Sequence, residues 1–196
     1  MANWQSYTSF VGSHWTYTQM NSDSCGPSCV MMMIRKRTNV VISEKDAFLA
    51  YDSYGNDASY KNPTGVVIRE YQGDVYTSAN RLARTIRTLI GNAKHHNVDV
   101  NNVGPVIRVG LQKGPMIGLV SWRGGGGHFV MIDGGGSWNG QYYVSACDPW
   151  DGAVRLIPLA KSGPINYAPD YPDTIKVQGQ MGGGKSNGYF NGWFVL

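Results

Sequence analysis

Residues 19–36 read QMNSDSCGPSCVMMMIRK, and this stretch predicts the start of the helix around which the rest of the chain is arranged. Pro27 favours a first helical turn, because its ring fixes φ near the helical value and its missing N–H has no helical partner there. The apolar run from Val30 to Ile34 predicts that this helix enters the core. Cys25 is therefore expected where the helix begins.

A cysteine at this position has two interpretations. A helix N-terminus carries roughly half a positive charge and several unpaired N–H groups, and both favour the nucleophilic thiolate over the thiol. The alternative is a small buried hydrophobic residue, which is the usual state of a free cysteine. The stretch alone leaves both open.

The bulk composition is that of a globular protein with one domain. The 196 residues are 42% hydrophobic and 15% charged, and the net charge is only +4. The basic residues 35–37 and Arg81, Arg84 and Arg87 are too sparse to indicate nucleic-acid binding, so we interpret them as solvated faces. No apolar run approaches the roughly 20 residues of a membrane span, so membrane insertion is not expected.

The three cysteines do not form the dense, even pattern of a disulfide framework. No second cysteine pair or spaced histidine pair accompanies Cys25 and Cys29, so we expect neither a zinc site nor any cofactor. We interpret His14 as structural, because the sequence near it holds no acidic or cysteine pattern. The neighbouring residues His95 and His96 are expected in a polar turn, where a double histidine is usually exposed and inert.

The first half of the chain reads as helical. The aromatic N-terminal arm at 1–24 is expected to be extended, with a possible short strand, and to pack on the domain by its rings. Helices are expected at about 25–37, 47–51, 79–90 and 105–113, with a long polar loop at 52–76. Ser43 and Asp46 resemble a capping box at the second helix. The third helix carries the clearest amphipathic stripe, which includes Leu82, Ile86 and Leu89.

The second half reads as strands, at 116–122, 128–133, 141–147, 153–159 and 189–196, separated by Gly-rich or Asn-Gly turns. The prediction is an α+β fold in a single domain, with a helical lobe at about 1–113 and an antiparallel sheet lobe at about 114–196. A site is expected in the cleft between the lobes.

A cysteine nucleophile requires a base and an acceptor that orients the base. His128 follows four glycines and opens an apolar strand, which would deliver its imidazole to the lobe boundary; an incidental histidine after a hairpin turn is the alternative. Asp148 ends the next strand and could accept from the His128 ring, although Asp-Pro is also a common turn. Asp133 competes for this role, but its strand runs away from His128.

Two further residues complete the predicted constellation. The Gln19 side-chain amide, six residues before Cys25, could donate to an oxyanion beside the Cys25 backbone N–H. Trp150 is expected to shield the bond between His128 and Asp148. Each element is weak alone, and their order along the chain gives the prediction its strength.

These residues resemble the papain-like cysteine peptidases of bacterial type. Gln19-x5-Cys25-Gly-Pro, Gly-His128-Phe-Val and Asp148-Pro-Trp are similar to motifs of double-glycine leader peptidases and of secreted papain-fold effector proteases. The resemblance implies a papain-like fold in which Cys25 is the nucleophile, His128 the base, Asp148 the orienting residue and Gln19 an oxyanion-hole donor. It spans about residues 19–159.

The chain departs from the plant and lysosomal members of that family. Pro27-Ser28-Cys29 replaces their usual pattern beside the nucleophile, and the orienting residue is Asp148 instead of asparagine. The separation of 103 residues between Cys25 and His128 is shorter than the roughly 130 of those enzymes. Substrate specificity is therefore not carried over from the family.

Residues Gly179–Ser186 (GQMGGGKS) match the P-loop pattern of nucleotide-binding proteins literally. A P-loop requires a strand before it and a helix after it, whereas the ten residues after Ser186 read as a turn and a strand. No nucleotide is expected as a partner.

The expected function is hydrolysis of peptide or protein substrates by a cysteine peptidase. An amidase, deamidase or acyl transferase with the same triad is an alternative, and an inactive peptide-binding module is another. The N-terminus lacks the basic and apolar regions of a secretory signal. We therefore expect a bacterial effector exported by another route, a mature fragment, or a cytoplasmic protein.

Overall fold

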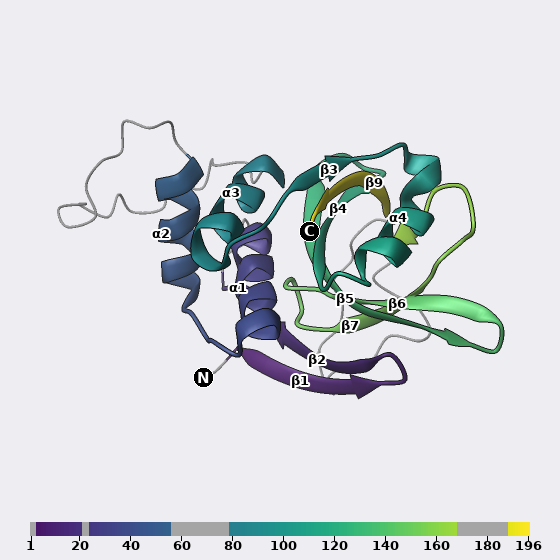
Figure 1. Ribbon diagram of the computed structural model, residues 1–196, viewed down its shortest axis with the longest axis horizontal. Helices are drawn as coiled ribbons and strands as arrows, with labels where there is room; N and C mark the ends of the chain where they lie inside the picture. Colours follow the sequence, from purple (N-terminus) through teal and green to yellow (C-terminus); the bar gives the residue numbers. More distant parts are fainter. Residues whose placement is uncertain (1–2, 21–23, 56–78, 168–187) are drawn as a thin grey trace.

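The computed structural model describes residues 3–20, 24–55, 79–167 and 188–196. Within these ranges helices accompany an antiparallel sheet, so the expected α+β class is confirmed (Figure 1). The P-loop match at Gly179–Ser186 and most of the predicted polar loop lie outside the described residues. None of the helices in the described ranges is long and apolar enough to span a membrane.

The first helix, α1 (Cys25–Thr38), begins at Cys25, as predicted. Its first backbone hydrogen bond runs from the Ser28 N–H to the Ser24 carbonyl, at 2.9 Å. Asn39 ends the helix in the left-handed conformation, with φ of 59°, and its N–H donates to the Arg35 carbonyl at 2.9 Å. The whole run from Cys25 to Ile34 is buried.

The second helix, α2 (Glu44–Gly55), extends into the segment predicted as a loop. The predicted cap is present: Ser43 Oγ accepts from the Asp46 N–H at 3.1 Å and donates to the Asp46 carboxylate at 2.6 Å. The third helix, α3 (Ala79–Ile90), buries Leu82 and Ile86 as expected, whereas Leu89 is 39% exposed.

A short turn and a helix connect the strands at 95–97 and 116–122. A 3₁₀ turn, η1 (Val100–Asn102), leads into α4 (Val103–Gly110), which is shorter than the helix predicted at 105–113. The Asp99 side chain accepts from the Asn101 N–H at 2.8 Å and so caps η1.

The main sheet is antiparallel throughout, in the order β3-β9-β4-β5-β6-β7, with β8 also paired to β9. Its strands are β3 (His95–Asn97), β4 (Met116–Trp122), β5 (Gly127–Trp138), β6 (Gln141–Cys147), β7 (Val154–Pro158), β8 (Asn166–Tyr167) and β9 (Gly188–Val195). The predicted strands at 116–122 and 141–147 match β4 and β6 residue for residue.

The first half of the chain holds more strand than the extended arm with a possible short strand that was predicted there. The N-terminal arm forms a hairpin of β1 (Trp4–Ser9) and β2 (Gly12–Tyr17), and His95 and His96 lie in β3 and not in a turn. The hairpin packs beside α1, where Trp4 and Tyr7 cover buried side chains of the core (Figure 1). Irregular spacing of the aromatic residues concealed these strands.

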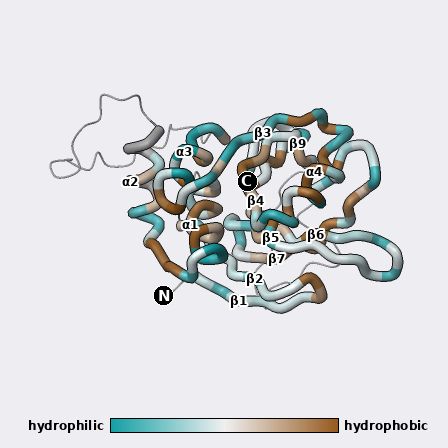
Figure 2. The backbone as a smooth tube through the Cα atoms, in the orientation of Figure 1, coloured by the Kyte–Doolittle hydropathy of each residue, from teal (hydrophilic) through white to brown (hydrophobic). Residues whose placement is uncertain are grey.

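Two hydrophobic clusters lie on opposite sides of β5. Phe129 and Met131 pack with α1 and α3, whereas Val130 and Ile132 pack with α4 and the remaining strands. Figure 2 shows hydrophobic segments in α1 and in α4, one in each cluster. Because successive side chains of β5 point to opposite faces of the sheet, this strand packs against the helical part of the fold on one face and against the second cluster on the other.

Candidate active site

Cys25 is the first residue of α1, and its side chain is 9% exposed. No acidic residue lies in the first turn of the helix, and Ser24 makes no side-chain cap. The partial positive charge of the helix N-terminus therefore acts on the Cys25 sulfur with no carboxylate in the first helical turn to oppose it. The N–H groups of Phe129 and Gly26 also donate to this sulfur.

His128 is the second residue of β5 and is buried. A tight turn after β4 brings it there, with Gly125 and Gly126 at φ of 94° and 82°, a conformation that residues with a side chain rarely adopt. Its Nε2 lies 2.6 Å from Oδ1 of Asp148, and the ring also forms a hydrogen bond with the Cys25 thiol. With Nε2 bound to Asp148, Nδ1 is the nitrogen that remains for Cys25.

Asp148 follows β6 directly, and each of its two carboxylate oxygens accepts two hydrogen bonds. Oδ1 accepts from His128 and from the Trp150 N–H at 2.8 Å. Oδ2 accepts from Arg155 Nη1 at 2.9 Å and from the Tyr167 hydroxyl at 2.5 Å. A carboxylate bound on all sides holds its orientation, so the His128 ring is oriented as well.

Arg155 connects this carboxylate to a second one. Its guanidinium contacts Asp148 and also donates to Asp151 at 3.1 Å and 2.6 Å. Arg155 is 2% exposed, although it stands in the middle of the apolar strand β7. A lone charge inside an apolar strand was the signal that could have identified this residue from sequence. Tyr167 gave no such signal.

Two tryptophans enclose the His128 ring. Trp122 stacks on it with ring centroids 5.7 Å apart and an interplanar angle of 18°. Trp150 meets it edge-on, at 6.4 Å and 88°, and is itself 37% exposed. Sequence reasoning expected the shielding by Trp150 but missed Trp122, which comes from β4, six residues before His128.

The charges of Cys25 and His128 depend on each other. Burial favours the neutral thiol, but the hydrogen bond and charge of His128 outweigh it, so the pKa of Cys25 lies below its ordinary value. Burial likewise favours neutral imidazole, and the Asp148 charge outweighs that effect and raises the pKa of His128 to about 9. A thiolate paired with an imidazolium is the form that this environment favours.

The groups around Asp148 keep fixed charges at neutral pH. Despite burial, His128 and Arg155 hold the pKa of Asp148 far below its ordinary value. The pKa of Tyr167 is well above its ordinary value, first because of burial and then because of Asp148, so its hydroxyl remains a donor.

Cys25 differs from the other two cysteines, although all three are buried. Burial raises the pKa of Cys29 and of Cys147 well above the ordinary value, and nearby negative groups add to this effect. Cys29 lies one helical turn beyond Cys25 but is fully buried. Only Cys25 combines a lowered pKa with residual exposure, so it is the reactive candidate of the three.

Gln19 lies in the segment between β2 and α1. Its backbone N–H donates to the Pro149 carbonyl at 2.7 Å, which ties this segment to the turn that carries Asp148. Residues 21–23, which link Gln19 to the start of α1, lie outside the described ranges. The Gln19 side chain is partly buried beside this turn.

His14 and Asp133 form a second buried pair. Asp133, the competitor for orienting His128, instead binds His14 Nδ1 at 2.9 Å, and Ser9 Oγ lies 2.8 Å from His14 Nε2. The Lys36 ammonium from α1 contacts both Asp133 oxygens, at 3.1 and 3.2 Å. The acidic partner of His14 could not be found in the sequence near it, because Asp133 is 119 residues away.

Cys147 adds its sulfur to this second pair, so that three possible metal ligands lie within 4.8 Å of one another. Lys36 already supplies a positive charge to both oxygens of Asp133. A cation would have to displace this ammonium from a buried carboxylate, so we assign the group a structural role.

No family model matches the chain, and no curated protein matches its sequence. The arrangement of Cys25, His128 and Asp148 is therefore the feature of the chain that bears on its function.

Proposed function

We propose that the chain is a papain-like cysteine peptidase with Cys25, His128 and Asp148 as its catalytic triad. One observation carries the proposal: the thiol with the lowered pKa is hydrogen-bonded to an imidazole that a fully bonded carboxylate orients. Nucleophile, base and orienting residue in contact are the parts that covalent catalysis requires.

The fold proposed with this function is a single papain-like domain. The helical lobe holds α1 to α3 with the β1–β2 hairpin attached, and the sheet lobe holds the long strands. Cys25 comes from the helical side, while His128 and Asp148 come from the sheet. A substrate bound between the lobes would meet all three side chains.

The first half of the proposed reaction forms a thioester. The Cys25 thiolate attacks the peptide carbonyl carbon, and the carbonyl electron pair moves to oxygen as the tetrahedral oxyanion forms. The Cys25 N–H at the helix start and the Gln19 side-chain amide donate to this oxyanion. The His128 imidazolium then gives its proton to the leaving amine as the carbon–nitrogen bond breaks.

The second half regenerates the thiolate. Neutral His128 removes a proton from water, which attacks the thioester carbonyl and releases the carboxylic acid. Asp148 keeps its charge throughout and stabilises the imidazolium each time it forms. No step requires a metal or a cofactor.

Three other functions use the same geometry. An amidase or deamidase would attack a side-chain amide, and an acyl transferase would pass the thioester to an amine instead of water. An inactive peptide-binding module would retain the fold without turnover. The lowered pKa of Cys25 favours a reacting enzyme over this last alternative.

A mixed peptide library incubated with the protein and analysed by mass spectrometry tests the proposal. New N-termini and a mass gain of one water per cleavage are expected, and Cys25→Ala should abolish them. Release of ammonia without chain cleavage would assign an amidase or deamidase instead. Absence of any product, together with ordinary reactivity of Cys25, would overturn the enzymatic proposal.

A further inference from the structure

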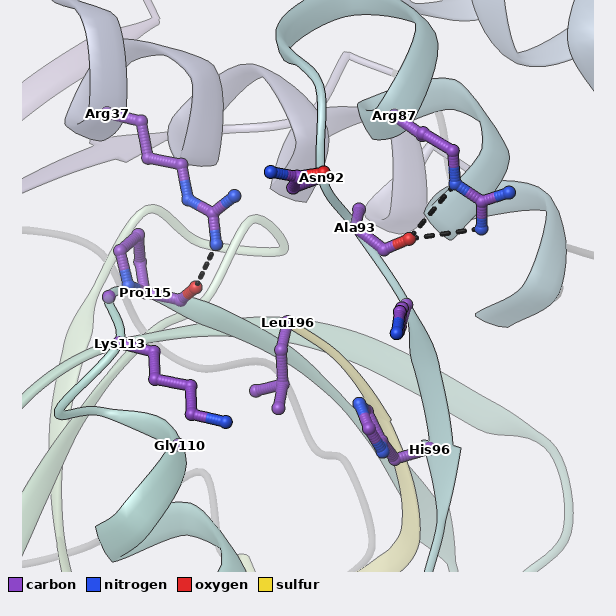
Figure 3. Close-up of a pocket in the computed structure, with 11 residues that line it drawn as sticks. Arg37, Arg87, Asn92, Ala93, His96, Gly110, Lys113, Pro115 and Leu196 are labelled. Carbon is purple, nitrogen blue, oxygen red and sulfur yellow. Dashed lines mark hydrogen bonds between the residues drawn. The ribbon is translucent and has the colours of Figure 1, made fainter.

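A cavity of about 990 Å³ lies at the opposite end of α1 from Cys25. The ends of α1, α3 and α4, the strand β3 and the turn after α4 contribute to its walls (Figure 3). Arg37 lies twelve residues after Cys25, which corresponds to about 18 Å along the helix. The cavity is therefore separate from the proposed active site.

Basic side chains dominate the polar lining of this cavity. They are Arg37, Arg87, Lys94, His96 and Lys113. Among the described residues that line it, none is acidic. Two arginines and two lysines are among the five, which gives the lining side chains a formal charge of +4 when histidine is counted as neutral.

The basic groups come from both sides of the cavity. Figure 3 shows Arg37 and Lys113 on one side and Arg87 and His96 on the other, with Leu196 between them. Lys94 is held beside Leu196 by two backbone hydrogen bonds of 3.0 Å. A ligand between the two sides would contact cations on each.

The two arginines are oriented by backbone carbonyls. Arg37 Nη2 donates to the Pro115 carbonyl at 3.4 Å, and Arg87 donates from Nε and Nη2 to the Ala93 carbonyl at 3.1 and 3.0 Å. A guanidinium has five N–H donors, so each arginine retains donors beyond these bonds. Neither arginine pairs with a carboxylate in the part of the chain that the structure describes.

The neighbouring basic residues of α1 have partners of their own. Arg35 lies 3.6 Å from the Trp15 ring centroid and 4.5 Å from that of Trp4, and Lys36 binds Asp133. Lys36 and Arg37 are exposed, as the interpretation of residues 35–37 as a solvated face predicted, whereas Arg35 is half-buried. Of these three residues, only Arg37 lines the cavity. It forms no ion pair with another residue that the structure describes.

We propose that this cavity binds a compact polyphosphate, a small molecule that carries several phosphate groups close together. Arginine forks and lysine ammoniums are the side chains that recognise phosphate oxygens, and both kinds converge here from separate elements. The volume lies within the range of small-molecule pockets, and Ala93, Pro115 and Leu196 supply apolar lining. A long nucleic acid would instead require a basic stripe along the surface.

The proposal is tested by calorimetric titration of the full chain with inorganic tripolyphosphate at low salt. Lys94→Gln combined with Lys113→Gln removes two cavity charges, and neither lysine forms an ion pair with another described residue. This double variant should keep its unfolding temperature and bind tripolyphosphate at least about tenfold more weakly. The arginine–carbonyl bonds remain intact in it.

A matched control is Arg84→Gln combined with Lys161→Gln, which removes the same charge from exposed positions outside the cavity. Its affinity for tripolyphosphate should stay within about twofold of that of the native chain, because salt screens exposed charges outside the cavity. An equal loss of tripolyphosphate affinity in both double variants would overturn the proposed site. So would the absence of tripolyphosphate binding to the native chain. Citrate should bind at least about tenfold more weakly than tripolyphosphate, and equal binding would overturn the assignment to phosphate.

Discussion

His128 Nε2 lies 2.6 Å from Asp148 Oδ1, and both side chains are at least 95% buried. This pair fixes which nitrogen of the imidazole faces Cys25 and favours its protonated form. The contact between His128 and Asp148 therefore influences the pKa of the Cys25 thiol, although Cys25 is not part of that contact.

Alkylation by iodoacetamide should select Cys25 among the three cysteines. At pH 6 an ordinary thiol is almost wholly protonated, whereas the Cys25 thiolate is stabilised by His128. We expect Cys25 to react at least about tenfold faster in the native chain than in His128→Ala. Peptide mapping assigns the label to its residue.

Cys29→Ala is the matched control, since this residue lies one turn away but is fully buried with a raised pKa. Its removal should leave the labelling rate of Cys25 unchanged. Labelling that rises only near pH 8.5, alike in the native chain and in His128→Ala, would show an ordinary thiol.

The stability of the Cys25→Ala protein should fall as the pH rises from about 6.5 toward 9. The folded pKa of His128 is raised above its unfolded value of 6.5, to about 9 in the native chain, so the folded state retains this proton longer. Its stabilising contribution is complete below pH 6.5 and is lost as His128 deprotonates. Urea unfolding at several pH values measures the trend.

The Cys25→Ala background is needed because a thiol with a lowered pKa contributes with the opposite sign over this range. Adding Asp148→Asn to Cys25→Ala should abolish the fall in stability between pH 6.5 and 9, because the His128 imidazole then loses its negative partner. Stability that stays constant or increases between pH 6.5 and 9 would contradict the raised pKa of His128. ¹⁵N NMR of the ring provides an independent titration.

Replacing the two competing aspartates should separate their roles. Asp148→Asn should slow alkylation of Cys25 at pH 6 by at least about tenfold, since the imidazolium loses its stabilising charge. Asp133→Asn should leave the rate unchanged and reduce the free energy of unfolding by about 1–3 kcal/mol, because it weakens bonds to His14 and Lys36. If only Asp133→Asn slowed the alkylation of Cys25, Asp133 and not Asp148 would be the residue that stabilises the imidazolium.

Arg155→Met should destabilise the fold by about 3–5 kcal/mol, because it leaves Asp148 and Asp151 buried without their common cation. Chemical denaturation measures the change. Arg84→Met, on the exposed face of α3, is the control and should stay within about 0.5 kcal/mol of the native chain. Similar losses in both variants would show that the Arg155 bonds contribute little.

Gln19→Ala tests the proposed oxyanion donor. Loss of one such donor should lower kcat by about 100-fold and leave alkylation of Cys25 unchanged, because alkylation forms no oxyanion. Gln19→Glu keeps the shape but replaces the donor by a carboxylate, and it should be at least as impaired. An unaltered kcat in both variants would exclude Gln19 from the reaction.

Local signals in the sequence predicted much of the fold. The start of α1 at Cys25, the cap at Ser43 and the bounds of β4 and β6 all follow from turn chemistry and apolar periodicity. The β1–β2 hairpin was predicted only as an extended arm with a possible short strand. The buried residues that alternate in β2, His14 and Thr16, are polar, so this alternation does not appear as a hydrophobic pattern. Short strands paired at a turn give little periodicity to detect.

Side-chain partners far apart in sequence were the harder part. The contact between His128 and Asp148 was expected from adjacent strands, whereas Arg155 and Tyr167 reach Asp148 from β7 and β8. The pair of His14 with Asp133 depends on how the hairpin folds against β5. Such contacts are fixed by tertiary packing, which a single sequence does not reveal.

The division of the proposed triad between a helix at residue 25 and strands more than 100 residues later has a consequence during synthesis. Until β5 and β6 have emerged from the ribosome and paired, Cys25 has neither its imidazole nor a folded environment. The growing polypeptide therefore carries an ordinary, weakly reactive thiol. The lowered pKa of Cys25 therefore arises only after residues 128 and 148 have been synthesised and folded against α1.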